Sequence, residues 1–279
     1  MKKNITLSDY KTGKAPLYCS KDYEVNYIDF IKTMYRVGLK EGDTVLVHSD
    51  VLTFGKPVFK NLDIFFQCLV DLFFEVLTGD GTLIMPTFNY DFPKIKKFNI
   101  ANTTSVTGAL TNYFRKLKGV KRTYDPIHSH AIHGRMQNEY LNIGNETFGR
   151  DSVYGKLHSD NAKIMTFGTS FNNNNFFHYI ETQKKVHYRY SKTFNGEIIE
   201  GSKILNISFE YFVRDLEKNV VTDTSLFVKK MKSNEILKFA KIGHSSISSA
   251  QSKAFFDFGS QCLDENIYCF LKKPYPQYD

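Results

Sequence analysis

Two residues capable of acid–base chemistry lie three positions apart near the middle of the chain. His178 and Glu181 belong to Phe176–Lys184, a segment whose pattern predicts a helix, so both side chains are expected on one helix face. Imidazole has an unperturbed pKa of about 6.5, which suits a general base near neutral pH, and a nearby carboxylate can orient it. The plain alternative is a core or surface histidine beside a solvated glutamate.

The residues before this helix are expected to place it at the edge of a sheet. Ile164–Phe167 is predicted to be a short buried strand, Gly168 lets the backbone leave the sheet, and Asn172–Asn175 offers N-caps for the helix. An open α/β sheet carries its ligands at this kind of strand-to-helix junction. The histidine and the glutamate are therefore expected at the end of a strand.

Composition describes a globular protein. The chain has 279 residues, of which 42% are hydrophobic and 24% charged, which excludes a disordered chain. Met1–Lys11 has no apolar run, so no signal peptide is expected, and a polar stripe on the helix predicted over Leu62–Leu77 indicates a buried helix and not a membrane span. The four cysteines form no CxxC pair, which favours reduced thiols and a cytoplasmic protein.

The formal net charge of +8 favours anionic partners such as nucleic acid, phosphorylated cofactors or acidic membranes. A solvated basic surface is the commoner explanation, and the chain has no long run of lysine and arginine. Basic residues are spread along the chain without a basic-aromatic face, which argues against nucleic acid as the partner.

Helices and strands alternate in the first half of the chain, which predicts an α/β fold with a layered, mixed and mostly parallel sheet. The predicted elements there are helix 24–37, strand 44–47, helix 62–77, strand 82–85, an excursion loop over 90–102 and a helix from 105–108 to 116. Helix 153–158 follows, and an antiparallel hairpin turning at Asn195-Gly196 is expected from strands 186–193 and 197–209. The last predicted elements are helices 234–241 and 249–262 and strand 267–271. We expect one domain over 1–279 with a β-rich insertion at about 186–232.

Two further motifs could bind ligands. Ser105 or Thr107 could cap a helix whose free N–H groups would suit a phosphate, although most such residues only cap. In H-S-H-A-I-H, His128 and His130 share a strand face, but no third ligand stands at typical spacing, so no metal site is expected.

A series of motifs resembles the aminoglycoside 3-N-acetyltransferase family, also called the antibiotic N-acetyltransferase family. The landmarks occur in the order V-L-V-H-S-D, G-D-G-T-L-I-M-P-T-F-N, S-V-T-G-A-L-T-N-Y-F-R, R-T-Y-D-P-I-H-S-H-A-I-H-G, F-G-R-D-S-V-Y-G-K-L, and I-M-T-F-G with F-F-H-Y-I-E. Each motif alone is weak, but six in order make a fairly specific match over roughly Tyr23–Gln261. Departures from the family pattern fall at Asp125, at Val153 and in the Asn-Asn-Phe-Phe before His178.

The resemblance implies transfer of an acetyl group from acetyl-CoA to an amine of an amino sugar, with an α/β fold and no metal. His178 matches the family's catalytic histidine and Glu181 the carboxylate that follows it. The positions that match the CoA groove are His48, Ser49, Ser105, Thr107, Gly108, Arg122, His128 and Ser129.

Such a reaction needs a base, because the amine must lose a proton before it attacks a thioester. The chain has neither a G-x-S-x-G elbow nor a cysteine within a motif, which fits direct transfer without an acyl-enzyme. The Asn-rich loop and the helix start at Phe176 are expected to offer N–H donors to the developing negative charge.

The acceptor is expected to be a small anionic molecule, because an enzyme for polycationic aminoglycosides should be acidic and this chain is at +8. A nucleotide-linked amino sugar is one example. Three alternatives stay open: an aminoglycoside-resistance 3-N-acetyltransferase, a family member that binds CoA without turnover, and a basic nucleic-acid-binding protein without catalysis. No membrane or nucleic-acid partner is expected, and a homodimer is left open.

Overall fold

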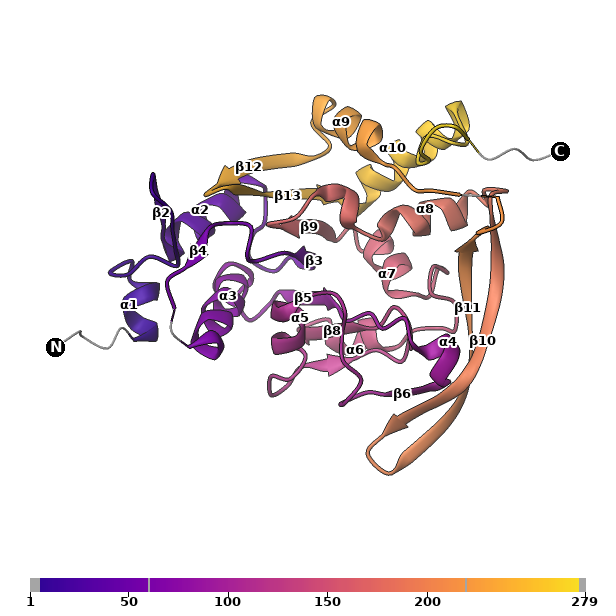
Figure 1. The fold of residues 1–279 in the computed structure, drawn as a ribbon, viewed down its shortest axis with the longest axis horizontal. Helices are drawn as coiled ribbons and strands as arrows, with labels where there is room; N and C mark the ends of the chain where they lie inside the picture. The colour runs from indigo at the N-terminus through magenta and orange to yellow at the C-terminus, as the bar shows by residue number, and fades with distance from the viewer. Residues whose placement is uncertain (1–5, 60, 219, 276–279) are drawn as a thin grey trace.

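A seven-stranded sheet in the order β12-β13-β9-β3-β5-β8-β7 forms the centre of the structure, which is a computed structural model (Figure 1). It describes residues 6–59, 61–218 and 220–275. The sequence predicts that Met1–Lys11 is not a signal peptide; residues 1–5 of that segment lie outside the described residues. The strands of this sheet are β3 (Thr44–Ser49), β5 (Thr82–Pro86), β7 (Lys121–Arg122), β8 (His130–Gly134), β9 (Lys163–Phe167), β12 (Lys238–Ile242) and β13 (Ser245–Gln251).

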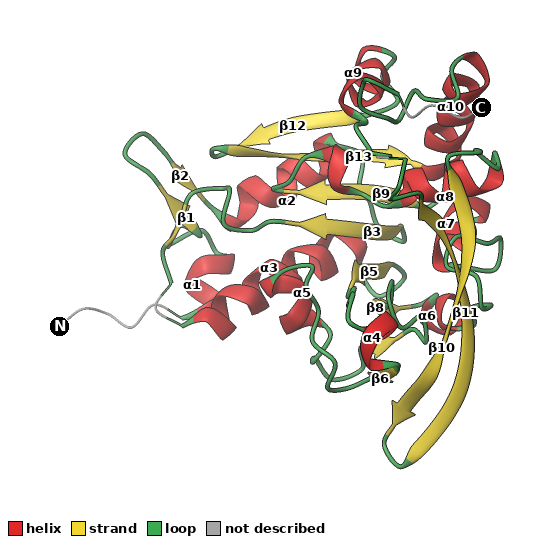
Figure 2. Cartoon of the chain, turned by 45° about the vertical axis from the view of Figure 1, so that its right-hand side comes forward, coloured by secondary structure: helices red, strands yellow, loops and turns green. Residues whose placement is uncertain are grey.

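The parallel strands of the sheet lie at its middle. β3 pairs in parallel with both β9 and β5, in the registers Leu46↔Ile164 and Leu46↔Ile84. Antiparallel strands extend the sheet on either side, β13 and β12 next to β9, and β8 and β7 next to β5. Figure 2 shows β12, β13, β9 and β3 following one another across the sheet. This arrangement confirms the predicted mixed α/β class.

Helices cover both faces of the sheet, because alternate strand residues point to two different cores. Val45 and Val47 of β3 belong to the core on the side of α2 and α3, while Leu46 belongs to the core on the side of α7, α8 and α10. The helices are α1 (Leu7–Lys11), α2 (Tyr27–Arg36), α3 (Leu62–Leu77), α4 (Phe92–Ile95), α5 (Ala109–Phe114), α6 (Gln137–Leu141), α7 (Val153–Ser159), α8 (Phe176–Gln183), α9 (Ser225–Ser233) and α10 (Ser252–Glu265), with a 3₁₀ turn at Phe171–Asn173.

Two small sheets complete the fold. β1 (Tyr18–Cys19) lies between β2 (Glu24–Val25) and β4 (Lys56–Pro57). The second sheet is the long hairpin of β10 (Arg189–Glu200) and β11 (Lys203–Arg214), with β6 (Lys97–Asn99) added in parallel to β10. Figure 1 shows this hairpin curving along one end of the molecule. The hairpin lies within the insertion predicted at about 186–232, while the division into one domain stays a prediction.

The predicted hairpin turn at Asn195-Gly196 is wrong. Both residues lie within β10, and the chain turns after Glu200, where Gly201 has φ +60. Gly196 has another role, since a Cβ there would lie 2.5 Å from the carbonyl oxygen of Lys96. A dipeptide typical of turns thus marks the place where a neighbouring segment approaches the strand closely.

Other predictions failed around this hairpin and near the C-terminus. The predicted loop 90–102 contains α4 and β6. Residues 238–241 of the predicted helix 234–241 belong to strand β12, and residues 234–237 form a turn. The predicted strand 267–271 forms turns with one bridge, Leu271 to Thr222. β6 and the bridge at Leu271 depend on partners distant in sequence, and β12 depends on its pairing with the next strand, β13, which a single segment does not reveal. None of the helices within the described residues has the length and apolarity needed to cross a membrane.

Candidate active site

The ends of the parallel strands gather the predicted site residues at one edge of the sheet. His48 and Ser49 end β3, and β9 ends at Phe167, before the turn that leads to α8. β8 runs antiparallel to β5, so His128–His130 enters the sheet at the edge where β5 leaves it. The fold therefore brings His48, His128 and His178 together, as a strand-edge site requires.

His178 and Glu181 form a hydrogen-bonded pair on α8. Nδ1 of His178 lies 2.7 Å from Oε2 of Glu181, and the two residues are one helix turn apart. The histidine side chain is 22% exposed and the glutamate side chain is fully buried. The carboxylate thus fixes the ring from the protein side, and the pair has the geometry of a base with an orienting acid.

Two residues that the sequence did not single out complete the surroundings of the carboxylate. The hydroxyl of Tyr188 donates to Oε1 of Glu181 over 2.9 Å, and Nε of Arg189 lies 2.7 Å from Oε2. Both follow directly after α8, in a segment whose alternation predicted only a strand. The segment after α8 contains a cation that could pair with Glu181, but the position of Arg189 in the sequence alone does not identify it as the partner.

These contacts set the ionisation of the pair. Burial, followed by the positive charge of Arg189, lowers the pKa of His178, although the hydrogen bond that the ring donates to Glu181 opposes this shift. Burial would raise the pKa of Glu181, but Arg189 and the hydrogen bond to His178 outweigh it and lower that pKa below its usual value. The glutamate is therefore ionised, and His178 is neutral near neutral pH.

Three more histidines are buried beside this pair and are held neutral. Burial lowers the pKa of His48 to about 4 and, with the charges of His178 and His48 adding to it, that of His128 to about 3. Burial also lowers the pKa of His130, to well below its usual value. Within the described residues, buried polar atoms without a hydrogen-bond partner include both ring nitrogens of His48 and His130, Nδ1 of His128, and the hydroxyl of Ser49.

Aromatic rings hold His128 and His178 in place. Phe88 stacks on His128 with ring centroids 4.4 Å apart, and Phe148 meets both imidazoles edge-on, at 5.3 Å from His128 and 5.6 Å from His178. Phe148 thus lies between the two histidines, and its apolar ring contributes to the low polarity that keeps them neutral.

The segment from Ser105 to Gly108 lies next to the end of β3. A Cβ on Gly108 would lie 3.6 Å from the carbonyl oxygen of Ser49, and Gly108 has φ +121, in the region that favours glycine. The hydroxyls of Ser105 and Thr107 bond to each other at 2.6 Å, and Thr107 also donates to the carbonyl of Pro86. Helix α5 begins only at Ala109, so neither hydroxyl is its N-cap.

The side chains of Arg122 and Ser129 are hydrogen-bonded to other parts of the protein. Nε of Arg122 donates to the hydroxyls of Thr87 and Ser129, and its terminal nitrogens donate to the carbonyls of Thr87, Thr103 and Ile100. The side chain is 6% exposed. Its observed contacts hold three loops together, and direct contact between Arg122 and CoA stays a prediction.

Asp125, where the chain departs from the family pattern, anchors the loop that carries His128. Its carboxylate accepts hydrogen bonds from the hydroxyls of Tyr211 and Thr147 and from the amides of Ile127 and His128. Tyr211 belongs to β11, so the hairpin and the histidine loop share one buried carboxylate.

The start of α8 offers fewer N–H donors than the sequence implied. The amide of Phe176 donates to Oδ1 of Asn174, and that of His178 donates to the carbonyl of Asn175. Those two amides are therefore engaged within the loop. No group of histidine, cysteine and acidic side chains among the described residues has the arrangement of a metal site.

Comparison with known proteins identifies the family to which the chain belongs. The sequence profile of the family described as aminoglycoside 3-N-acetyltransferase matches residues 46–264. The chain belongs to this family. Every one of the predicted site residues lies within the matched range, which agrees with the resemblance seen in the sequence and makes the protein an N-acetyltransferase by family.

Individual relatives are distant in sequence. The SPbeta prophage-derived aminoglycoside N(3')-acetyltransferase-like protein YokD of Bacillus subtilis (strain 168) is 28% identical over 197 residues, 60% of this chain and 68% of that protein. The crystal structure of the aminoglycoside acetyltransferase AAC(3)-IVa matches with a TM-score of 0.72 at 20% identity, covering 90% of this chain and 93% of that one. AAC-IIIb in a binary complex with CoASH gives a TM-score of 0.72 at 15% identity, covering 90% and 98%. The similarity to the structures of AAC(3)-IVa and AAC-IIIb shows that this chain shares their fold.

Proposed function

We propose that the protein transfers an acetyl group from acetyl-CoA to an amine of an anionic amino sugar, with His178 as the general base. The observation that carries this proposal is the hydrogen bond between Nδ1 of His178 and the buried carboxylate of Glu181. With Nδ1 engaged, Nε2 is the atom that accepts the proton from the acceptor amine. A neutral imidazole is ready for this role, and a positioned base contributes about 10²–10⁴-fold to the rate.

The end of β3 suits the co-substrate. His48 and Ser49 carry buried polar atoms without partners, next to the backbone of Gly108, and such atoms can bond the polar groups of an extended ligand. The AAC-IIIb structure, which shares the fold, contains CoASH. Bound acetyl-CoA would supply the acyl carbon that the amine attacks, with the thiolate as leaving group.

The charges near His178 favour an anionic acceptor. Arg189 and Arg214 lie directly opposite each other on the antiparallel strands β10 and β11, and both act on the pKa of His178. Glu181 neutralises Arg189, while Arg214 is exposed and forms no ion pair within the described residues. Arg214 therefore leaves a positive charge that acts on His178 and has no ion-pair partner among the described residues, and an anionic group on the acceptor could pair with it.

The test compares amino-sugar acceptors of different charge. Thiol release from acetyl-CoA would be followed with glucosamine, a phosphate ester of glucosamine, a uridine-diphosphate-linked amino sugar and gentamicin; a mutant of AAC(3)-IVa has been solved in complex with a gentamicin. We expect the anionic sugars to be turned over fastest and gentamicin weakly or not at all. Efficient turnover of gentamicin would contradict the anionic acceptor, and turnover unaffected by His178→Gln would contradict the histidine base.

A further inference from the structure

One exposed aromatic side chain beside the histidine cluster takes no part in the contacts described so far. Tyr90 lies in the loop between β5 and α4 and is 56% exposed, while its neighbours at this edge of the sheet, Phe88 and Phe148, are buried. The hydroxyl of Tyr90 forms no hydrogen bond within the described residues. This tyrosine thus presents both a ring and a hydroxyl to a ligand at the site.

Hydrogen bonds fix the backbone on both sides of Tyr90. The backbone amide of Asn89 donates to the carbonyl of Ile127 over 2.9 Å, and its side-chain amide donates to the carbonyl of Thr104 over 3.1 Å. Oδ1 of Asn89 accepts a hydrogen bond from the amide of Asp91 over 3.0 Å. Because these bonds hold the loop that carries the exposed ring, a ligand that packs on this ring requires little further ordering of the protein.

Ring contacts connect Tyr90 to the proposed base. The rings of Tyr90 and His128 meet edge-on with their centroids 6.1 Å apart. Phe148 meets His128 at 5.3 Å and His178 at 5.6 Å. The four rings form one continuous series, with Tyr90 at one end and the base at the other. A molecule whose amine reaches Nε2 of His178 is therefore bound beside this series.

The segment proposed for the co-substrate lies toward the other face of the sheet. Val47 belongs to the core on the side of α2 and α3, and Ser49, two positions further along β3, points the same way. Gly108 lies against Ser49 and leads into α5, whose buried residues belong to that same core. Phe148, in the middle of the ring series, belongs to the core on the side of α7 and α8. Tyr90 therefore lies with the base, where the acceptor must bind.

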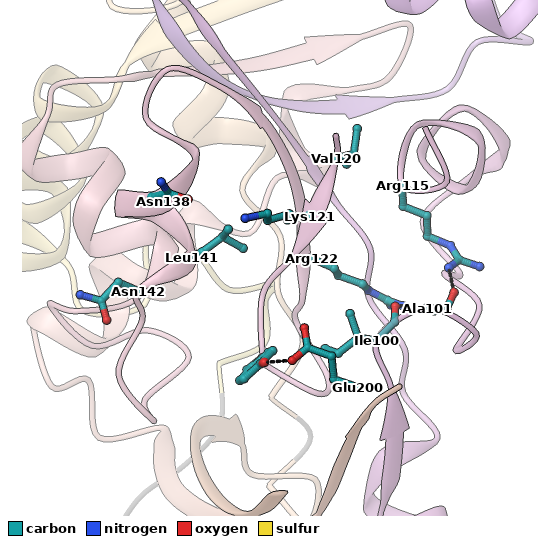
Figure 3. Close-up of a pocket in the computed structure, with 11 residues that line it drawn as sticks. Ile100, Ala101, Arg115, Val120, Lys121, Arg122, Asn138, Leu141, Asn142 and Glu200 are labelled. Atoms are coloured by element: carbon teal, nitrogen blue, oxygen red, sulfur yellow. Dashed lines mark hydrogen bonds between the residues drawn. The ribbon is translucent and has the colours of Figure 1, made fainter. Parts of the chain in front are cut away.

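A cavity elsewhere in the structure does not include these groups. It has a volume of about 570 Å³, and Arg115, Lys121 and Arg122 belong to its lining (Figure 3). Among the described residues, its lining contains neither Tyr90 nor His178. A sugar bound within that cavity does not contact the base, so the cavity is not the place of the reacting amine.

We infer that Tyr90 binds the sugar ring of the acceptor and is a specificity-determining residue of the acetyl transfer. The inference rests on the proposed function and names the group that holds the body of the acceptor while its amine meets Nε2 of His178. The face of a pyranose ring that carries C–H groups packs on the phenol ring, and the hydroxyl of Tyr90 bonds a hydroxyl of the sugar. Tyrosine supplies such contact area at a low cost in conformational entropy.

Steady-state kinetics of thiol release, with the amino sugar varied at saturating acetyl-CoA, give the first test. Tyr90→Ala should raise the KM of the acceptor by about ten-fold through the loss of one aromatic contact, and should change kcat by less than about two-fold. Tyr90→Phe keeps the ring, so its KM should stay within about three-fold of the unaltered protein. Tyr35→Ala is the matched control, because Tyr35 is 52% exposed on α2, and should change neither constant.

Fluorescence gives a second test that needs no turnover. The chain has no tryptophan, so Tyr90→Trp introduces a single indole at the proposed contact. Its emission would be titrated, with CoA present, against glucosamine, a phosphate ester of glucosamine and uridine diphosphate. We expect both sugars to change the emission and uridine diphosphate, which has no pyranose ring, to leave it unchanged. The emission of Tyr35→Trp should not respond to any of them.

The two tests separate failure of this inference from failure of the proposed function. If Tyr90→Ala acetylates an amino sugar with unaltered KM, the inference is overturned while the proposed function stands. A response of Tyr90→Trp to uridine diphosphate alone would overturn the sugar contact in favour of a stacked base. Thiol release with none of the acceptors would contradict the proposed function, and the emission of Tyr90→Trp would then decide the sugar contact by itself, an unchanged emission overturning it.

Discussion

Glu181 has two roles at once, because it orients His178 and neutralises Arg189. The carboxylate is fully buried and touches His178, Tyr188 and Arg189 within 2.9 Å. Without the carboxylate, Arg189 would depress the pKa of the imidazole further. The strength of the base therefore depends on a balance between one anion, on α8, and one cation, at the start of the hairpin.

Glu181→Gln should lower kcat/KM by about 10²-fold and move its acidic limb to lower pH. The base works when deprotonated, so kcat/KM rises with pH through the pKa of His178, which already lies below its usual 6.5. Glu181 raises that pKa, and its loss lowers the midpoint. The measurement is thiol release against pH, with Glu217→Gln on an exposed loop as the control. A midpoint that stays fixed or rises would contradict the assigned role of Glu181.

At the scale of elements, Tyr211 gives the hairpin β10–β11 a link to the site beyond the ion pair of Arg189 with Glu181. The hydroxyl of Tyr211 donates a hydrogen bond to Asp125 and accepts one from the amide of Ile127. Asp125 in turn fixes the loop before His128. The hairpin therefore supports the histidine cluster as well as carrying Arg189 and Arg214.

Tyr211→Phe should destabilise the protein by about 1–3 kcal/mol, since it leaves a buried carboxylate with one donor fewer. Urea unfolding followed by circular dichroism measures this change in the free energy of unfolding. Tyr190→Phe, at an exposed position of the same hairpin, should change it by less than about 0.5 kcal/mol. Equal effects of the two substitutions would show that the link between Tyr211 and Asp125 does not contribute to stability.

The sequence predicted those elements whose signals are local. α3 was predicted at its observed limits, and β3, β5, β9 and α8 within one or two residues. The hairpin turn and β12 were missed, because Gly196 serves a tertiary contact with Lys96 and because β12 depends on pairing with β13. The spacing of His178 and Glu181 could be read from the helix period. Arg189 as the partner of Glu181 could not, since only the fold brings the strand after α8 back against it.

For the molecule as a whole, buried neutral histidines should make stability depend on pH. The folded-state pKa values of His48 and His128 are about 4 and about 3, and that of His130 is also well lowered, all below the usual 6.5 of an unfolded chain. Below pH 6.5 the unfolded chain thus binds more protons than the folded one. This contribution to stability is complete above pH 6.5 and is lost as the pH falls toward 4 and below.

Each such histidine costs up to about 1.4 kcal/mol per pH unit in this window. We expect the free energy of unfolding to fall steeply between pH 6.5 and 4.5, before most carboxylates titrate. Urea unfolding at half-unit steps of pH would measure the slope, and His48→Asn should flatten it. A free energy that stays level across this window would mean that the histidines remain accessible to protons in the folded protein.

The parallel pairing of β6 with β10 has a consequence for how relatives of this chain can diverge. The backbone at Lys96 passes so close to Gly196 that no side chain fits between them. An insertion in either segment would shift its register against the other and bring a bulkier residue to that crossing. Changes of length in the two segments, a hundred positions apart in the chain, should therefore have been inherited together, and an alignment of homologous chains would show them as a correlated pair.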